Sequence, residues 1–201
     1  MAAENGKRVN ELKQLLQQAL KNIGDDSRIK NIRAVSGGDI NDAFLVETNE
    51  ARYFVKYNAH MPEGFFRSEA NGLERIRKTG AIAVSNVYQV IEQKNEGMLV
   101  MEWIAGDISP YTEEELGRGL ARLHSTIESQ FGLDEDTFIG TLPQPNGWYD
   151  RWIDYYRNCR LIPQCALAEK RKRMPSGRRA KLIKLCDTLD KWLPEDCDAS
   201  L

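Results

Sequence analysis

The 201-residue chain contains no long apolar run. No stretch approaches the roughly 18 residues that a membrane-spanning helix needs, and the N-terminus is polar, without the apolar segment of a secretory signal. The formal net charge is −2, so the positive excess typical of a nucleic-acid-binding protein is missing. These absences argue against a membrane span and a nucleic-acid partner, and they make the cytoplasm the expected location.

Metal-binding and disulfide patterns are missing as well. Only two histidines, His60 and His124, could add nitrogen ligands, and no C-x-x-C pair occurs among the four cysteines: Cys159, Cys165, Cys186 and Cys197. A disulfide framework is typical of small secreted chains, so we expect the cysteines to be small apolar fillers in helices. His124 follows Leu123 on the apolar side of a predicted helix, where we expect a packed structural residue.

Two phosphate-binding signatures are also absent, but a different arrangement is present. There is no G-x-x-x-x-G-K-[ST] and no G-x-G-x-x-G, which argues against a P-loop and a dinucleotide-binding site. Instead, the pair Gly37-Gly38 lies between two apolar runs, Lys56 ends a strand-like run, and Glu69 follows on a helix-like segment. Each feature alone is typical of a hairpin turn, a strand edge or a helix surface.

The order of these residues is what carries information. Glycines let backbone N–H groups approach phosphates, a strand lysine offers them a positive charge, and a helix glutamate holds the lysine in place. Glycine turn, strand lysine and helix glutamate, in this order, are typical of the small lobe of a kinase-like fold.

Hydrophobic periodicity predicts the elements around these residues. The predicted helices and strands of the first half are a helix at 7–22, strands at 29–35, 43–48, 52–57, 87–91 and 98–103, and a helix at 65–79. We therefore expect an α+β, protein-kinase-like fold, with a five-stranded antiparallel small lobe, one crossing helix, and part of a helical large lobe after it. The predicted organisation is a nucleotide-binding lobe at 1–103, a hinge at 104–111 and a partial helical lobe at 112–201.

The second half is expected to be mostly helical. Thr112 and Glu115 form a T-x-x-E capping box that begins a helix predicted to reach about residue 129. A long loop is predicted at 131–147, and a last helix at 178–193. Between them the aromatic-rich run W-Y-D-R-W-I-D-Y-Y-R predicts either a ligand-stacking surface or a helix core.

Several runs spread over nearly the whole chain share a pattern with one family. The most distinctive runs lie between Phe131 and Gln164, and the full set is Gly37-Gly38-Asp39-Ile40-Asn41, Tyr53-Phe54-Val55-Lys56, Phe66 with Glu69-Ala70-Asn71-Gly72-Leu73, Leu99-Val100-Met101-Glu102, Leu116-Gly117 with Leu120-Ala121-Arg122-Leu123-His124, Phe131-Gly132, Phe138-Ile139-Gly140-Thr141, Pro143-Gln144-Pro145-Asn146, Trp148, and Arg160-Leu161-Ile162-Pro163-Gln164. In these runs the chain resembles the fructosamine kinases, also called ketosamine kinases, of the aminoglycoside-phosphotransferase-like branch of the kinase fold.

The resemblance implies phosphorylation of the 3-hydroxyl of a ketosamine, a sugar adduct on an amine, with ATP and magnesium as cofactors. By position it implies that five residues lie over the phosphates: Gly37, Gly38, Asp39, Ile40 and Asn41. Lys56 would contact the phosphates and Glu69 would pair with Lys56. The adenine would meet Glu102, Trp103 and Ile104, and the sugar side of the cleft would include Asn146, Trp148, Asp150 and Trp152.

One departure from the family pattern concerns catalysis. The family's catalytic loop, H-G-D-L-W-x-G-N, and its later D-P-A have no counterpart, because neither histidine is followed by Gly-Asp. The resemblance therefore implies that the catalytic base and the magnesium ligands lie beyond Leu201, and we expect the chain to be an inactive fragment of a kinase. A helical lobe without its partners leads us to expect self-association, or partial disorder after about residue 105.

Two alternatives stay open at this point. One is a related kinase that acts on another amine, sugar or alcohol. The other is a non-catalytic module that binds nucleotide or a partner protein through the small lobe.

Overall fold

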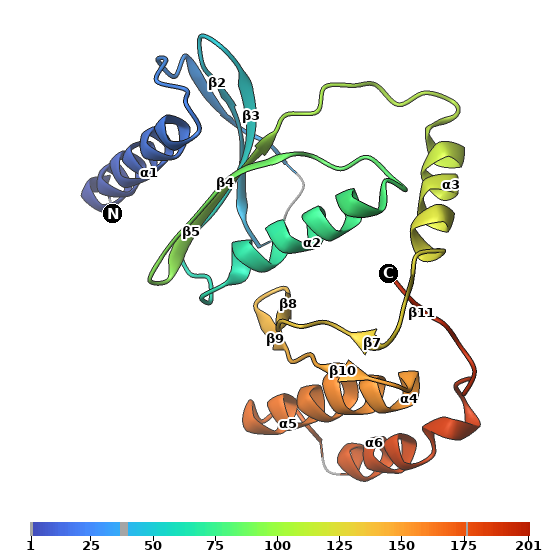
Figure 1. Cartoon of the computed structure of the whole chain (residues 1–201). Helices are drawn as coiled ribbons and strands as arrows, with labels where there is room; N and C mark the ends of the chain where they lie inside the picture. Colours follow the sequence, from blue (N-terminus) through green and yellow to red (C-terminus); the bar gives the residue numbers. More distant parts are fainter. Residues whose placement is uncertain (1, 37–39, 176) are drawn as a thin grey trace. The chain divides into compact units, whose positions relative to one another are not determined.

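The computed structural model describes residues 2–36, 40–175 and 177–201, and it divides the chain into two compact units, Met1–Glu115 and Leu116–Leu201 (Figure 1). The predicted glycine-loop residues Gly37, Gly38 and Asp39 lie outside the described residues. In the described part of the chain, no helix is long and apolar enough to cross a membrane.

The first unit is a five-stranded antiparallel sheet with a helix on each face, which confirms the predicted small-lobe architecture. The strand order is β1-β2-β3-β5-β4, so β5 pairs with β3 and β4 forms the edge of the sheet beside β5. The elements are α1 (Ala2–Asn22), β1 (Asn31–Ala34), β2 (Asp42–Glu47), β3 (Arg52–Asn58), α2 (Phe65–Thr79), β4 (Val87–Gln93) and β5 (Glu96–Glu102).

Alternation along the strands separates the two faces of the sheet. One face packs against α1, where Leu16, Ala19 and Leu20 are buried against Val55 and Val100 of β3 and β5. The residues between these strand positions point to the opposite face, along which α2 lies (Figure 1). Because both faces are covered, β5 is buried from Gly97 to Met101, whereas β3 alternates buried Tyr53, Val55 and Tyr57 with half-buried residues that include Lys56.

A buried carboxylate fastens the end of α1 to the sheet. Asp25 is 4% exposed, and its carboxylate accepts hydrogen bonds from the hydroxyls of Ser27 (2.5 Å), Thr48 (2.7 Å) and Tyr53 (2.9 Å) and from the Ser27 N–H (2.9 Å). Burial raises the pKa of Asp25, but these hydrogen bonds outweigh burial, so the pKa lies below its ordinary value. Burial, and then the bond to Asp25, raise the pKa of Tyr53 to about 12.

The second unit contains helices and short strand pairs. Its elements are the end of α3 (Thr112–His124), then β6 (Ile127–Glu128), β7 (Phe131–Gly132), β8 (Thr137–Ile139), β9 (Leu142–Gln144), β10 (Trp148–Tyr149), α4 (Trp152–Tyr155), a π-helical segment (Tyr156–Leu161), α5 (Ile162–Lys170), α6 (Arg178–Asp187), a 3₁₀ turn (Leu189–Lys191) and β11 (Ala199–Ser200). The expected loop at 131–147 therefore contains β7, β8 and β9, with β8 pairing with β9 and β7 with β10.

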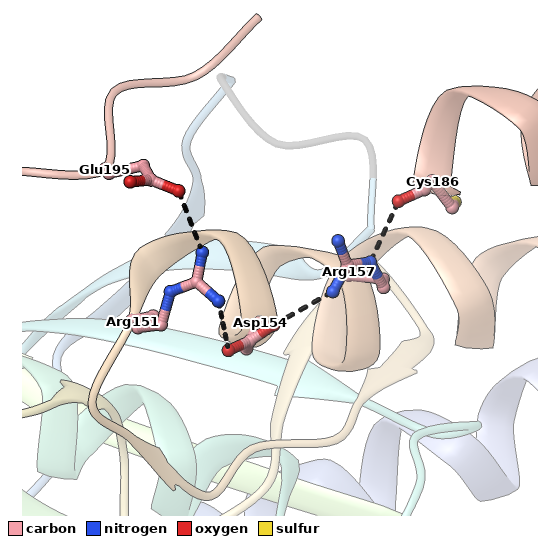
Figure 2. Close-up of polar contacts among 5 residues, drawn as sticks. All are labelled: Arg151, Asp154, Arg157, Cys186 and Glu195. Carbon is pink, nitrogen blue, oxygen red and sulfur yellow. Dashed lines mark hydrogen bonds and ion pairs between the residues drawn. The ribbon is translucent and has the colours of Figure 1, made fainter. Parts of the chain in front are cut away.

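Two arginines, Arg151 and Arg157, join the continuous helical segment at 152–170 to the C-terminal part of the second unit (Figure 2). The Arg157 guanidinium donates to the Cys186 carbonyl (2.9 Å) and to the Asp154 carboxylate (2.9 Å). Arg151 approaches the other oxygen of the same carboxylate at 3.7 Å and donates to the Glu195 carboxylate at 3.3 Å. Asp154 therefore orients both guanidinium groups, and these hold α6 and the segment after it.

The structure corrects several predictions in the second half. The helix predicted at 178–193 ends at Asp187 and is followed by the 3₁₀ turn at Leu189–Lys191. The helix predicted to reach residue 129 ends at His124, where the Ser125 hydroxyl donates to the Ala121 carbonyl and the chain continues into β6. His124 is exposed and not packed, because only Leu123 of that turn faces inward. Cys159 and Cys186 are buried in helical segments as expected, but Cys197 is exposed and lies outside any helix.

Candidate functional site

Lys56 lies on a central strand, on the face that α2 covers. Its neighbours Val55 and Tyr57 are buried on the α1 side, so alternation directs Lys56 to the opposite side. In register it lies between Ala43 of β2 and Leu99 of β5. A lysine flanked by apolar strands is held at its base while its ammonium group extends from the sheet.

Glu69 of α2 meets that ammonium group. The Lys56 Nζ and the Glu69 Oε1 are 2.5 Å apart, and the two side chains are 28% and 29% exposed. The predicted pairing of these residues is therefore present in the structure. Because an ammonium group carries three hydrogens, Lys56 can hold Glu69 and still donate to two further acceptors. Glu69 thus holds the Lys56 ammonium group in place, with N–H donors suited to an anionic group such as a phosphate.

Two residues that the sequence analysis did not single out, Asn58 and Glu92, bind segments next to this pair. The Asn58 amide, two residues after Lys56 on the same face, donates to the Ile40 carbonyl (3.0 Å) and to the Asn41 side chain (2.9 Å). Glu92 of β4 binds the N-terminus of α2. An asparagine that ends a strand is a common turn residue, so Asn58 gave a weak signal. Glu92 gave none, because its contacts are 25 and 26 residues away along the chain.

The end of the predicted glycine loop is thereby placed beside the lysine strand. Ile40 and Asn41 are the described residues of that loop, and Asn58 ties both to the end of β3. Their predicted place over the phosphates stays a prediction, as does that of Gly37, Gly38 and Asp39.

The predicted adenine-contacting residues lie at the end of β5 and just after it. The Glu102 carboxylate accepts hydrogen bonds from the side chain and backbone N–H of Asn86 (2.8 and 3.2 Å). This side chain therefore binds the residue just before β4. The Trp103 ring lies 6.3 Å from the Phe54 ring, and Ile104 is exposed. A depression of about 620 Å³ adjoins Glu102 and Trp103, but neither Lys56 nor Glu69 lines it.

Asn146, the first of the predicted sugar-side residues, lies in the second unit and anchors a loop. Its amide nitrogen donates to the Glu135 carbonyl (2.9 Å) and the Thr137 hydroxyl (3.1 Å), while its amide oxygen accepts from Arg160 (2.7 Å) and Tyr155 (3.0 Å). Both ends of the amide are therefore engaged inside the protein. Burial raises the pKa of Tyr155, and the Arg160 charge over its ring opposes that rise.

The other three sugar-side residues differ in exposure. Trp148 of β10 is 45% exposed, and Asp150 is exposed and accepts a hydrogen bond from Gln130 (2.8 Å). Trp152 is half-buried and stacks on Tyr156 with 5.4 Å between the ring centres. The aromatic run is thus partly helix core, and contact of any of these residues with a sugar stays a prediction.

Comparison with known proteins places this arrangement in a family. The family model described as fructosamine kinase matches residues 10–197. A probable ketoamine kinase of Synechocystis is 37% identical over 159 residues, which are 78% of this chain and 54% of that protein. The chloroplastic protein-ribulosamine 3-kinase of Arabidopsis thaliana is 36% identical over 148 residues, 72% of this chain and 45% of that protein. The chain spans about half the length of these relatives.

Solved structures agree with the sequence matches. A protein of Haemophilus somnus assigned as a fructosamine-3-kinase has a TM-score of 0.76 at 26% identity, over 90% of this chain and 63% of that one. The aminoglycoside phosphotransferase APH(4)-Ia has a TM-score of 0.60 at 14% identity, over 94% of this chain and 63% of that one, and it supports the kinase-like fold alone. With its family match across 10–197 and its Lys56–Glu69 pair in place, the chain belongs to the fructosamine kinase family.

Proposed function

We propose that this chain forms the nucleotide-binding part of an ATP-dependent kinase that phosphorylates a sugar hydroxyl of a ketosamine. The observation that carries the proposal is the 2.5 Å ion pair between Lys56 and Glu69 on the α2 face of the sheet. In kinase-like sites such a pair directs the lysine at the nucleotide phosphates, where a positive charge stabilises the transferred group. The relatives, described as ketoamine and ribulosamine kinases, support the acceptor class.

The residues assigned to the nucleotide follow from this arrangement. Lys56 would donate to phosphate oxygens while Glu69 keeps its ammonium group from turning away. Ile40 and Asn41, held by Asn58, would end the loop that covers the phosphates. The backbone of Glu102 to Ile104 would meet the adenine edge.

The residues that would contact the sugar, the use of magnesium and the cellular location rest on more indirect support. Within the described ranges, no cluster of three or more His, Cys, Asp or Glu is placed to hold a metal ion, so we derive no step through magnesium. Magnesium use and the predicted inactivity of the 201 residues alone rest on the family pattern. A cytoplasmic location, self-association and sugar contacts at Trp148 and Asp150 also stay predictions.

Calorimetric titration with ATP and magnesium tests the proposal. Removing the Lys56 charge with Lys56→Ala should raise the Kd for ATP about 10- to 100-fold, since a hydrogen bond to a charged group contributes about 1.5–3 kcal/mol. Lys78→Ala is the matched control, because Lys78 is an exposed lysine in the last turn of α2. Equal affinities for the unmutated chain and Lys56→Ala, or no binding by the unmutated chain, would contradict the proposal.

A further inference from the structure

The N-terminus of α2 has no capping side chain of its own. Gly64 occupies the N-cap with φ 80°, and no acidic residue lies in the first turn. The first N–H groups of a helix have no partner within the helix and need an outside acceptor. A side chain from another part of the first unit can supply such an acceptor.

Glu92 of β4 supplies this acceptor. Its Oε1 lies 2.8 Å from the Phe66 N and 3.3 Å from the Arg67 N. A carboxylate at this end of a helix is favoured by the helix dipole as well as by the two hydrogen bonds. The same strand that ends the sheet thus fixes where α2 begins.

The turn between β4 and β5 holds the segment before α2 too. The Met61 N–H donates to the Asn95 carbonyl (2.8 Å), and the Met61 side chain is 2% exposed. It packs so closely over Gly97 that a β-carbon there would lie 2.4 Å from the Met61 Cε. The β4–β5 hairpin therefore fixes the start of α2 in three ways. These are the Met61–Asn95 backbone bond, the Met61 side chain over Gly97, and the Glu92 carboxylate.

This hairpin also holds the strand that carries the lysine. Leu99 of β5 is in register with Lys56 of β3, and Glu69 lies one helical turn after Phe66. The β4–β5 hairpin thus contacts both elements of the ion pair: β3, which carries Lys56, and α2, which carries Glu69. We propose that Glu92 is a positioning residue: it fixes the N-terminus of α2 so that Glu69 directs Lys56 at the ATP phosphates. This inference rests on the proposed nucleotide site.

The test compares ATP with adenosine, which lacks phosphates, in four variants: Glu92→Ala, Glu92→Gln, Glu69→Ala and the double variant Glu92→Ala/Glu69→Ala. Glu92→Ala should raise the Kd for ATP about five-fold, a free-energy change of about 1 kcal/mol, and leave the Kd for adenosine unchanged. Glu92→Gln keeps an acceptor oxygen and should restore most of the ATP affinity. Gln93→Ala, an exposed neighbour on β4, is the control.

The double variant decides whether Glu92 acts through Glu69. In the Glu69→Ala background, Glu92→Ala should add no further loss of ATP affinity. An equal rise in both Kd values, or a full additional loss in that background, would overturn the proposal.

If the unmutated chain binds no ATP, the proposed function fails. The unfolding temperatures of the same variants still test whether Glu92 positions Glu69. The two single shifts should sum to more than the shift of the double variant, because the loss of Glu92 weakens the same ion pair that Glu69→Ala removes. Additive shifts would overturn the positioning role.

Discussion

Replacing Asp25 by asparagine should destabilise the first unit in a pH-dependent way. The substitution keeps the shape of the side chain but removes the charge that four hydrogen bonds from Ser27, Thr48 and Tyr53 now stabilise. A hydrogen bond to an ionised group contributes about 1.5–3 kcal/mol and a neutral one about 0.5–1.5 kcal/mol. After the energetic cost of burying the charge is subtracted, the expected loss at neutral pH is about 2 kcal/mol.

The pH dependence follows from the direction of the pKa. Because the pKa of Asp25 is lowered in the folded chain, its stabilisation is complete above the ordinary value of 3.8. It is lost as the pH falls through the lower folded-state pKa. The difference in stability between the unmutated chain and Asp25→Asn should therefore be constant from pH 7 to about 5 and should shrink below about pH 4.

Native-state amide hydrogen exchange of the β3 core measures this difference within the first unit, with Asp26→Asn at the neighbouring exposed residue as the control. The stability of the first unit should fall in Asp25→Asn and stay the same in Asp26→Asn. Equal stability of Asp25→Asn and the unmutated chain at pH 7, or a difference that grows in acid, would show that the Asp25 charge does not stabilise the first unit.

Three further predictions concern packing and the second unit. Gly97→Ala should lower the unfolding temperature by overpacking against Met61, a loss of about 1–3 kcal/mol, whereas Gly72→Ala, on α2 with open space around it, should raise stability by about 0.5–1 kcal/mol. Asn146→Ala should destabilise the second unit by about 2 kcal/mol in urea unfolding, and an unchanged midpoint would count against its anchoring role. Arg157→Lys should speed amide exchange in α6, since a lysine cannot reproduce the two-way guanidinium contact.

The sequence predicted the sheet and the central ion pair because both depend on local patterns. The helix predicted at 65–79 is observed over the same residues, since an apolar stripe and a following glycine mark its length and end. The spacing of Lys56 and Glu69 indicated one strand residue and one helix residue that could meet, and they do. The β4–β5 turn is shorter than predicted, because Lys94 adopts a positive φ of 56° and the strands extend to Gln93 and from Glu96.

Features set by distant residues could not be predicted in the same way. The helix that begins at Thr112 stops at His124 because the next residues pair with Ala199 and Ser200, more than 70 positions later. The π-helical segment Tyr156–Leu161 lies inside a run whose apolar spacing resembles an ordinary helix. The role of Glu92 likewise depends on contacts between a strand residue and helix residues that lie 25 and 26 positions away in the chain, which no local pattern records.

A crystal structure of this chain with magnesium and a non-hydrolysable ATP analogue would test the proposed phosphate site at Lys56 most directly. We expect a phosphate oxygen within hydrogen-bond reach of the Lys56 Nζ, with the Glu69 carboxylate still bound to the same ammonium group. Phosphates bound away from Lys56, or a lysine that leaves Glu69 and points away from the nucleotide, would contradict it.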